Sequence, residues 1–124
     1  MESTTNKSND ALFNRLLQLK ADTDLEFIKE FLESAPKQLQ EDFTLLSQSI
    51  REGNSAKRVF HAHKLKGLLL TIGADAAAAL SMKLEGFAGG NDDTELQSLL
   101  SELEAELKEL LVTLDRIAPK LIDP

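Results

Sequence analysis

The side chains best suited to chemistry in this 124-residue chain are its two histidines, His61 and His63, which stand two positions apart. The chain has no cysteine, so neither a thiolate nucleophile nor a thiolate metal site can be built. A neutral imidazole has one unprotonated ring nitrogen and an ordinary pKa of about 6.5, so it can act as a nucleophile near neutral pH. A His-x-His pair is also compatible with a metal site if both rings share one face.

Helical periodicity separates the two rings. With His61 at zero and about 100° per residue, an apolar stripe centres near 60°. His61 lies at the edge of this stripe, whereas His63 falls near 200° and is predicted to face water. Two rings that diverge by about 200° cannot hold one ion, so a nucleophile is favoured over a metal site. The stripe is formed by Ala62, Leu65, Leu69 and Ile72.

Gly67 follows His63 by four residues, which places both positions on one helix face. Glycine inside a helix costs about 1 kcal/mol relative to alanine, so this position needs a reason. One interpretation is clearance for a bulky partner that approaches the imidazole, and the other is close packing against a neighbouring helix. The exposed histidine beside the glycine favours clearance.

The charge distribution is uneven around the histidines. The formal net charge is −7, which argues against a nucleic-acid-binding surface, because phosphate contacts need clustered basic residues. The window 55–74 nevertheless contains no acidic residue, while it holds four basic ones: Lys57, Arg58, Lys64 and Lys66. We interpret this window as favouring an anionic group or an acidic partner.

Apolar periodicity and capping residues predict the elements that must position the histidines. A short helix is expected over 11–20, and a long amphipathic run over 25–50 contains Pro36, where we expect a kink or a junction of two helices. Gly53 and Asn54 then separate this run from the histidine helix, which should end near Gly73. Two more helices are expected, over 74–87 and from Asp92 to a stop at Pro119.

These elements predict an all-α protein, an antiparallel four-helix bundle with an additional short N-terminal helix. The last helix carries a leucine seam over 96–117 that could pair with another chain, but the short connections favour closure within one monomer. We expect a disordered tail over 1–9, the domain over 10–118 and a C-terminal tail over 119–124. No signal peptide or membrane span is recognisable, which favours a soluble, cytoplasmic protein.

The histidine segment also resembles a known family. His63-Lys64-Leu65-Lys66-Gly67, followed by Ile72-Gly73-Ala74 and then Leu84-Glu85, is similar to the signature of histidine phosphotransfer (HPt) domains: H-x-L-K-G, then G-A, then L-E. Within the helical pattern on both sides, the resemblance covers roughly residues 22–117. His61 does not match the motif.

The resemblance implies a phosphocarrier rather than an enzyme, with the phosphoryl group on His63. Lys66 would help to neutralise that group and Gly67 would give access to it, while docking would use Val59, Phe60, Lys64 and Leu70. The partners would be receiver domains of response regulators, with a hybrid histidine kinase as a further candidate. Mg²⁺ would be needed only in the receiver, so we expect neither a cofactor nor a metal in this chain.

A second interpretation keeps the fold but not the chemistry. The chain could be a helical module that docks on a kinase or a receiver domain without carrying phosphate. Such a module has no need for His63, Lys66 and Gly67 together, so their presence favours the carrier.

Overall fold

The fold was obtained as a computed structural model, which describes residues 4–88 and 93–122. Every regular element in these two ranges is an α-helix, so the predicted all-α class is confirmed. In chain order the helices are α1 (Thr4–Asp22), α2 (Leu25–Arg51), α3 (Ser55–Ile72), α4 (Asp75–Glu85) and α5 (Asp93–Ile122).

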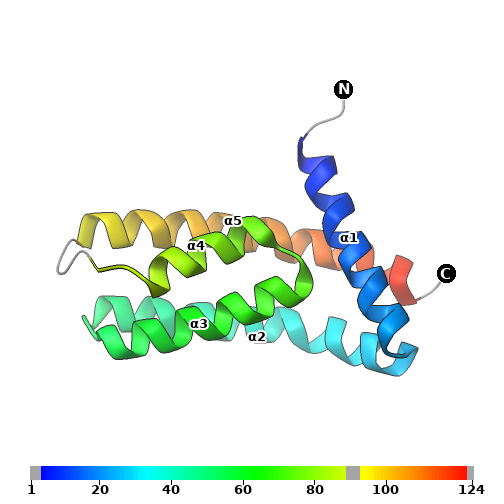
Figure 1. The fold of residues 1–124 in the computed structure, drawn as a ribbon, viewed down its shortest axis with the longest axis horizontal. Coiled ribbons are helices and arrows are strands. Elements are labelled where there is room, and N and C mark those ends of the chain that lie inside the picture. Colours follow the sequence, from blue (N-terminus) through cyan, green and yellow to red (C-terminus); the bar gives the residue numbers. More distant parts are fainter. Residues whose placement is uncertain (1–3, 89–92, 123–124) are drawn as a thin grey trace.

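Four of the helices pack in a ring, and the first lies across one end of them. Within the described ranges, α2 contacts α3, α3 contacts α4, α4 contacts α5, and α5 contacts α2. The four helices run along the long axis of the molecule, while α1 crosses them near the C-terminal end of α5 (Figure 1). The histidine helix α3 therefore packs mainly against α2 and α4, with a smaller contact to α1.

The ends of α3 follow the sequence closely because both have capping residues. Asn54 precedes the helix, and its side-chain oxygen accepts a hydrogen bond from the backbone N–H of Lys57 at 3.0 Å. At the other end Gly73 has a φ of 93°, in the left-handed region that glycine adopts without penalty. Gly53 makes a similar turn between α2 and α3, with a φ of 69°. The predicted bounds of the histidine helix are confirmed.

The proline within the second helix does not divide it. Pro36 has no backbone N–H, so the carbonyl of Leu32 lacks the usual intrahelical donor. Yet α2 is one helix from residue 25 to residue 51, so the alternative of two helices that meet near Ser34 is wrong. Buried residues continue on both sides of the proline, from Ile28 to Leu46. We attribute the continuity of the helix to this packed face, since packing supplies most helix stability in proteins.

The core is built almost entirely from leucine and isoleucine. The predicted leucine seam of α5 points into it, with six of its seven side chains at 8% exposure or less and Leu99 half-buried, so the seam is used within this chain. Within the described ranges, none of the helices is long and apolar enough to cross a membrane. The largest fully buried apolar side chains are Leu16, Ile28, Leu39, Leu46, Leu65, Leu69, Ile72, Leu84, Leu103 and Leu121.

Both outer helices extend further than the sequence predicted. The first begins at Thr4 instead of residue 11, so the expected disordered tail over 1–9 is helical from residue 4, and residues 1–3 lie outside the described ranges. The last continues through Pro119 to Ile122, which corrects the predicted stop and the C-terminal tail as far as residue 122. Leu121 is fully buried and its carbonyl accepts a hydrogen bond from Lys20, so packing offsets the cost of the proline.

The helix over 74–87 was predicted slightly too long. It spans Asp75–Glu85, and Gly86 follows it as the C-cap residue. Its inward face agrees with the prediction, since Ala77, Leu80 and Leu84 are buried and Phe87, beyond the helix, is half-buried. The predicted start of the last helix at Asp92 lies outside the described residues.

A difference between two glycines tests the packing of α1 on the histidine helix. An added Cβ at Gly73 would lie 2.8 Å from Cβ of Arg15, whereas one at Gly53 would meet nothing within 4 Å. Both residues have positive φ, so alanine costs roughly 1 kcal/mol at either position for backbone strain.

We therefore expect Gly73→Ala to lower the free energy of unfolding by more than Gly53→Ala, because only the former also displaces α1. Urea denaturation of both variants and of the wild type measures the difference. Equal losses would show that α1 does not pack closely against the turn at Gly73.

Candidate functional site

The two histidines of α3 have different environments, as the periodicity predicted. The side chain of His63 is 67% exposed, so the prediction that it faces water is confirmed. His61 is half-buried, with its ring edge against Phe60 at 5.2 Å between centroids, and its Nδ1 is buried without a hydrogen-bond partner. Among the described residues, no three or more histidine, cysteine, aspartate or glutamate side chains gather where they could hold a metal ion.

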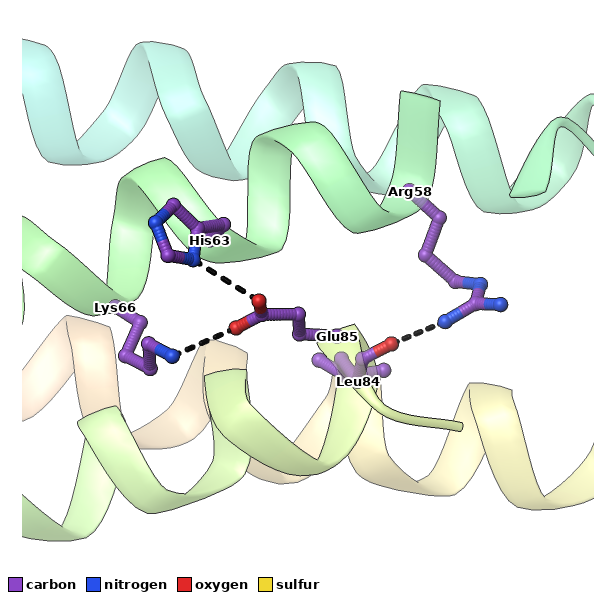
Figure 2. A network of polar contacts seen from close by, with 5 residues as sticks. All are labelled: Arg58, His63, Lys66, Leu84 and Glu85. Carbon is purple, nitrogen blue, oxygen red and sulfur yellow. Dashed lines mark hydrogen bonds and ion pairs between the residues drawn. The ribbon is translucent and has the colours of Figure 1, made fainter. Parts of the chain in front are cut away.

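The exposed histidine contacts a carboxylate from the next helix. Nδ1 of His63 lies 2.9 Å from Oε2 of Glu85, the last residue of α4. The other oxygen of the same carboxylate, Oε1, lies 2.9 Å from Nζ of Lys66. Figure 2 shows Glu85 between the two side chains of α3, with its carboxylate shared by both. The carboxylate thus joins the histidine and the lysine of one helix from the opposite helix.

The protonation states in this cluster follow from its contacts. The ion pair with Lys66, together with the hydrogen bond from His63, lowers the pKa of Glu85 below its ordinary value of 4.5, against an opposing effect of burial. Glu85 is therefore ionised at neutral pH and can only accept hydrogen bonds. For a neutral imidazole, the contact with Glu85 requires the proton on Nδ1. Nε2 of His63 then carries the free lone pair.

The space beside the histidine is open. A Cβ built at Gly67 meets nothing within 4 Å, so close packing against a neighbouring helix does not explain this glycine. Clearance on the exposed face of α3 is the interpretation that agrees with the geometry. Of the residues predicted to dock a partner, Phe60 is 59%, Leu70 46% and Val59 40% exposed. These three apolar side chains are on the surface of the same helix as His63.

Two of the four basic residues of the histidine helix, Lys64 and Lys66, are paired with acidic residues of other helices. Lys66 pairs with Glu85, and Nζ of Lys64 lies 3.5 Å from Oδ1 of Asp42, a carboxylate of α2 that is only 1% exposed. Oδ1 of Asp42 also accepts a hydrogen bond from Gln38 at 3.0 Å. Two of the four charges in the window 55–74 are thus balanced by Asp42 on α2 and Glu85 on α4, and the expectation of an anionic group or an acidic partner stays a prediction.

The sequence-predicted residues are thus divided by the structure into two groups. His63, Lys66 and Gly67 lie together on α3, which also carries the exposed Val59, Phe60 and Leu70, whereas Lys64 is held towards α2 by Asp42. No role was predicted for Glu85, although it is the acidic residue of the Leu84-Glu85 pair on which the resemblance partly rests. That pair was the available signal, since helical periodicity alone cannot show which residue of another helix faces His63.

The chain matches a known protein family over most of its length. The model of one family, described as Hpt domain, matches residues 26–116, which is more than half of the chain. Searches of curated proteins and of solved structures gave no match. The matched range includes the histidine segment of α3 and the whole of α4, and hence both partners of the contact between His63 and Glu85.

The lowered pKa of Glu85 predicts how stability changes with pH. The stabilisation by its ionised form is fully present above the unfolded pKa, near 4.5, and is lost as the pH falls through the lower folded pKa. Glu85→Gln removes the ionisation, so we expect the variant to be less stable than the wild type at about pH 7 and the gap to shrink at about pH 3.

Urea denaturation at the two pH values provides the measurement, and Glu102→Gln on the exposed surface of α5 is the matched control. A gap between wild type and Glu85→Gln that is unchanged from about pH 7 to about pH 3 would contradict the ionised contact.

Proposed function

The chain belongs to the Hpt domain family, whose members transfer phosphoryl groups through histidine in two-component signalling, and we propose that this member does so through Nε2 of His63. The observation that carries the proposal is the contact of Nδ1 with Glu85 at 2.9 Å. It assigns the ring proton to Nδ1 and leaves Nε2 unprotonated on a side chain that is 67% exposed. A nucleophile with a free lone pair and an open approach is what phosphoryl acceptance requires.

The reaction would begin with an aspartyl phosphate on a receiver domain. The lone pair of Nε2 attacks phosphorus and forms the N–P bond, while the P–O bond to the aspartyl carboxyl group breaks and the aspartate leaves as a carboxylate. Nε2 has no proton to lose, so no general base is needed at this step. The ring, still protonated at Nδ1, becomes positively charged, and the carboxylate of Glu85 stabilises that charge. Return transfer to another receiver reverses these bond changes.

The other members of the cluster would assist in different ways. Lys66 favours the ionised form of Glu85 and holds the carboxylate of that residue in place. Because this carboxylate also contacts the ring of His63, the ammonium of Lys66 is near enough to help neutralise phosphoryl oxygens. Gly67 leaves room for the receiver, because any side chain there would project into the open space beside His63. Positioning and charge neutralisation of this kind supply most of the catalysis in phosphoryl transfer.

The partner would dock on the surface around His63. Val59, Phe60 and Leu70 are exposed apolar side chains on α3, and exposed apolar surface can mark a site of protein interaction. Lys64 remains a candidate for a contact at the α2 side, since its side chain is 48% exposed despite the pair with Asp42. The Mg²⁺ required for the aspartate chemistry would belong to the receiver.

We further propose that α2–α5 form an antiparallel four-helix bundle that acts as a cytoplasmic monomer.

The docking module without phosphate is the alternative. It would use the same exposed apolar residues but would gain nothing from a carboxylate that fixes the proton of His63. The arrangement of Glu85, His63 and Lys66 therefore favours the carrier.

The two histidines provide the direct test of this function. We expect His63→Gln to abolish phosphoryl acceptance from a phosphorylated receiver domain and from phosphoramidate, a small donor, because Nε2 is the attacking atom. His61→Gln should retain acceptance, since its Nδ1 is buried and its ring is half-covered. Mass spectrometry of each variant measures the amount of phosphate bound per chain and the histidine that carries it. Acceptance by His63→Gln, or phosphate on His61, would refute the assignment.

A second test separates docking from chemistry. Phe60→Ala should slow acceptance from a phosphorylated receiver and leave acceptance from phosphoramidate unchanged, because the residue is 59% exposed and its ring packs against His61, which is not the proposed phosphorylation site. The free energy of unfolding should change by no more than about 0.5 kcal/mol, as at other surface positions. Val112→Ala on α5, where the side chain is 63% exposed, is the matched control. Equal effects of the two variants on transfer would exclude Phe60 from the docking surface.

A further inference from the structure

A buried arginine at the start of the histidine helix has no part in the chemistry proposed above. Arg58 is only 8% exposed, which is rare for a charged side chain unless it is paired. Among the described residues its partners are backbone carbonyl oxygens and an aromatic ring, and no carboxylate lies within ion-pair distance. A charge buried in this way needs several hydrogen bonds to be tolerated, so its position is well determined.

The hydrogen bonds of Arg58 bracket the residue that contacts the catalytic ring. Nη1 donates to the carbonyl oxygen of Leu84, and Nη2 donates to that of Phe87 at 3.2 Å. The guanidinium also lies over the ring of Phe87, 5.8 Å from its centroid. Glu85 stands between these two acceptors in the sequence. Figure 2 shows Arg58 and His63 reaching from α3 to adjacent residues at the end of α4.

The end of α4 is a place where such support matters. Glu85 is the last residue of the helix, and the carbonyls of a last helical turn have no intrahelical donors. Such a turn frays unless other groups bind these carbonyls, and a cation there also complements the negative end of the helix dipole. Arg58 meets both needs, with one hydrogen bond in the last turn and another two residues beyond it.

We propose that Arg58 is a positioning residue for phosphoryl transfer: it fixes the C-terminal turn of α4 so that Glu85 holds the proton of His63 on Nδ1. This inference rests on the proposed function. The side chain of Glu85 is bound by His63 and Lys66, and Arg58 binds the backbone carbonyls of Leu84 and Phe87 on either side of it, so all of these contacts come from α3. Loss of the backbone contact would let the carboxylate move while the helices stay packed.

The protonation of the ring gives a direct readout. At about pH 8, above the ordinary histidine pKa of about 6.5, the ¹⁵N chemical shifts of His63 report the fraction of neutral rings that carry the proton on Nδ1. We expect this fraction to be highest in the wild type, lower in Arg58→Lys and lowest in Arg58→Met. Lysine keeps the charge but cannot bridge two carbonyls as the guanidinium fork does. Lys57→Met, which removes a charge from an exposed neighbour on the same helix, should leave the fraction unchanged.

The Nδ1–H fraction is compared only among variants whose circular dichroism spectrum shows the same helix content as the wild type. If Arg58→Met does not fold, the comparison of Arg58→Lys with the wild type tests the proposal. An Nδ1–H fraction equal to that of the wild type in the folded variants would overturn the proposal. A general loss of stability does not move this ratio, so a purely structural role is distinguished. The Nδ1–H fraction is measured without phosphate, so it tests the role of Arg58 separately from the proposed function. The proposed function fails if the wild-type protein does not accept phosphate at His63, whatever the Arg58 variants show.

Acceptance from phosphoramidate adds a second criterion. If Arg58 acts through Glu85, Arg58→Met should slow acceptance in the wild-type background and have no further effect in Glu85→Gln. Losses that add in the double variant would show that Arg58 acts independently of Glu85, and would also overturn the proposal.

Discussion

A single carboxylate defines the chemistry of this surface. Glu85 is shared between His63 and Lys66, and through the first of these contacts it decides which ring nitrogen is free. The contact spans 22 positions in the chain, so it depends on the return of α4 alongside α3. The left-handed turn at Gly73 makes that return possible, and the packing of Leu84 in the core keeps the last turn of α4 against its neighbour. The fold therefore acts on the proposed nucleophile, His63, mainly through the position of the Glu85 side chain.

Much of this arrangement could be predicted from the sequence, because helical periodicity and capping are local properties. They gave the exposure of His63, the half-buried position of His61 and both ends of the histidine helix. They could not identify Glu85, Asp42 or the carbonyl acceptors of Arg58, since each of these belongs to another helix. Periodicity shows which face of a helix is buried but not which residue of the neighbour lies opposite.

The helix breaks that were wrongly predicted at the two prolines have a common physical cause. Pro36 and Pro119 both lie within helices, although proline removes a hydrogen-bond donor and collides with the preceding turn. Local rules count that cost but not the burial gained by continuing, as at Leu121. The charge pairs of α3 could not be predicted for a similar reason. Lys64 and Lys66 are paired with acidic residues of α2 and α4, which the sequence of α3 alone cannot show.

The open space beside Gly67 has a consequence for how this sequence can change. Since a methyl group would fit there without any clash, alanine would make the helix more stable by roughly 0.5–1 kcal/mol. Substitution to alanine is thus the easiest improvement in stability on α3, and selection for thermal resistance alone would favour it. If the glycine persists under selection for signalling, the constraint comes from a partner protein that docks beside His63, because the added methyl group would meet no other part of this chain within 4 Å. The position would then report whether a lineage still transfers phosphate or has kept only the fold.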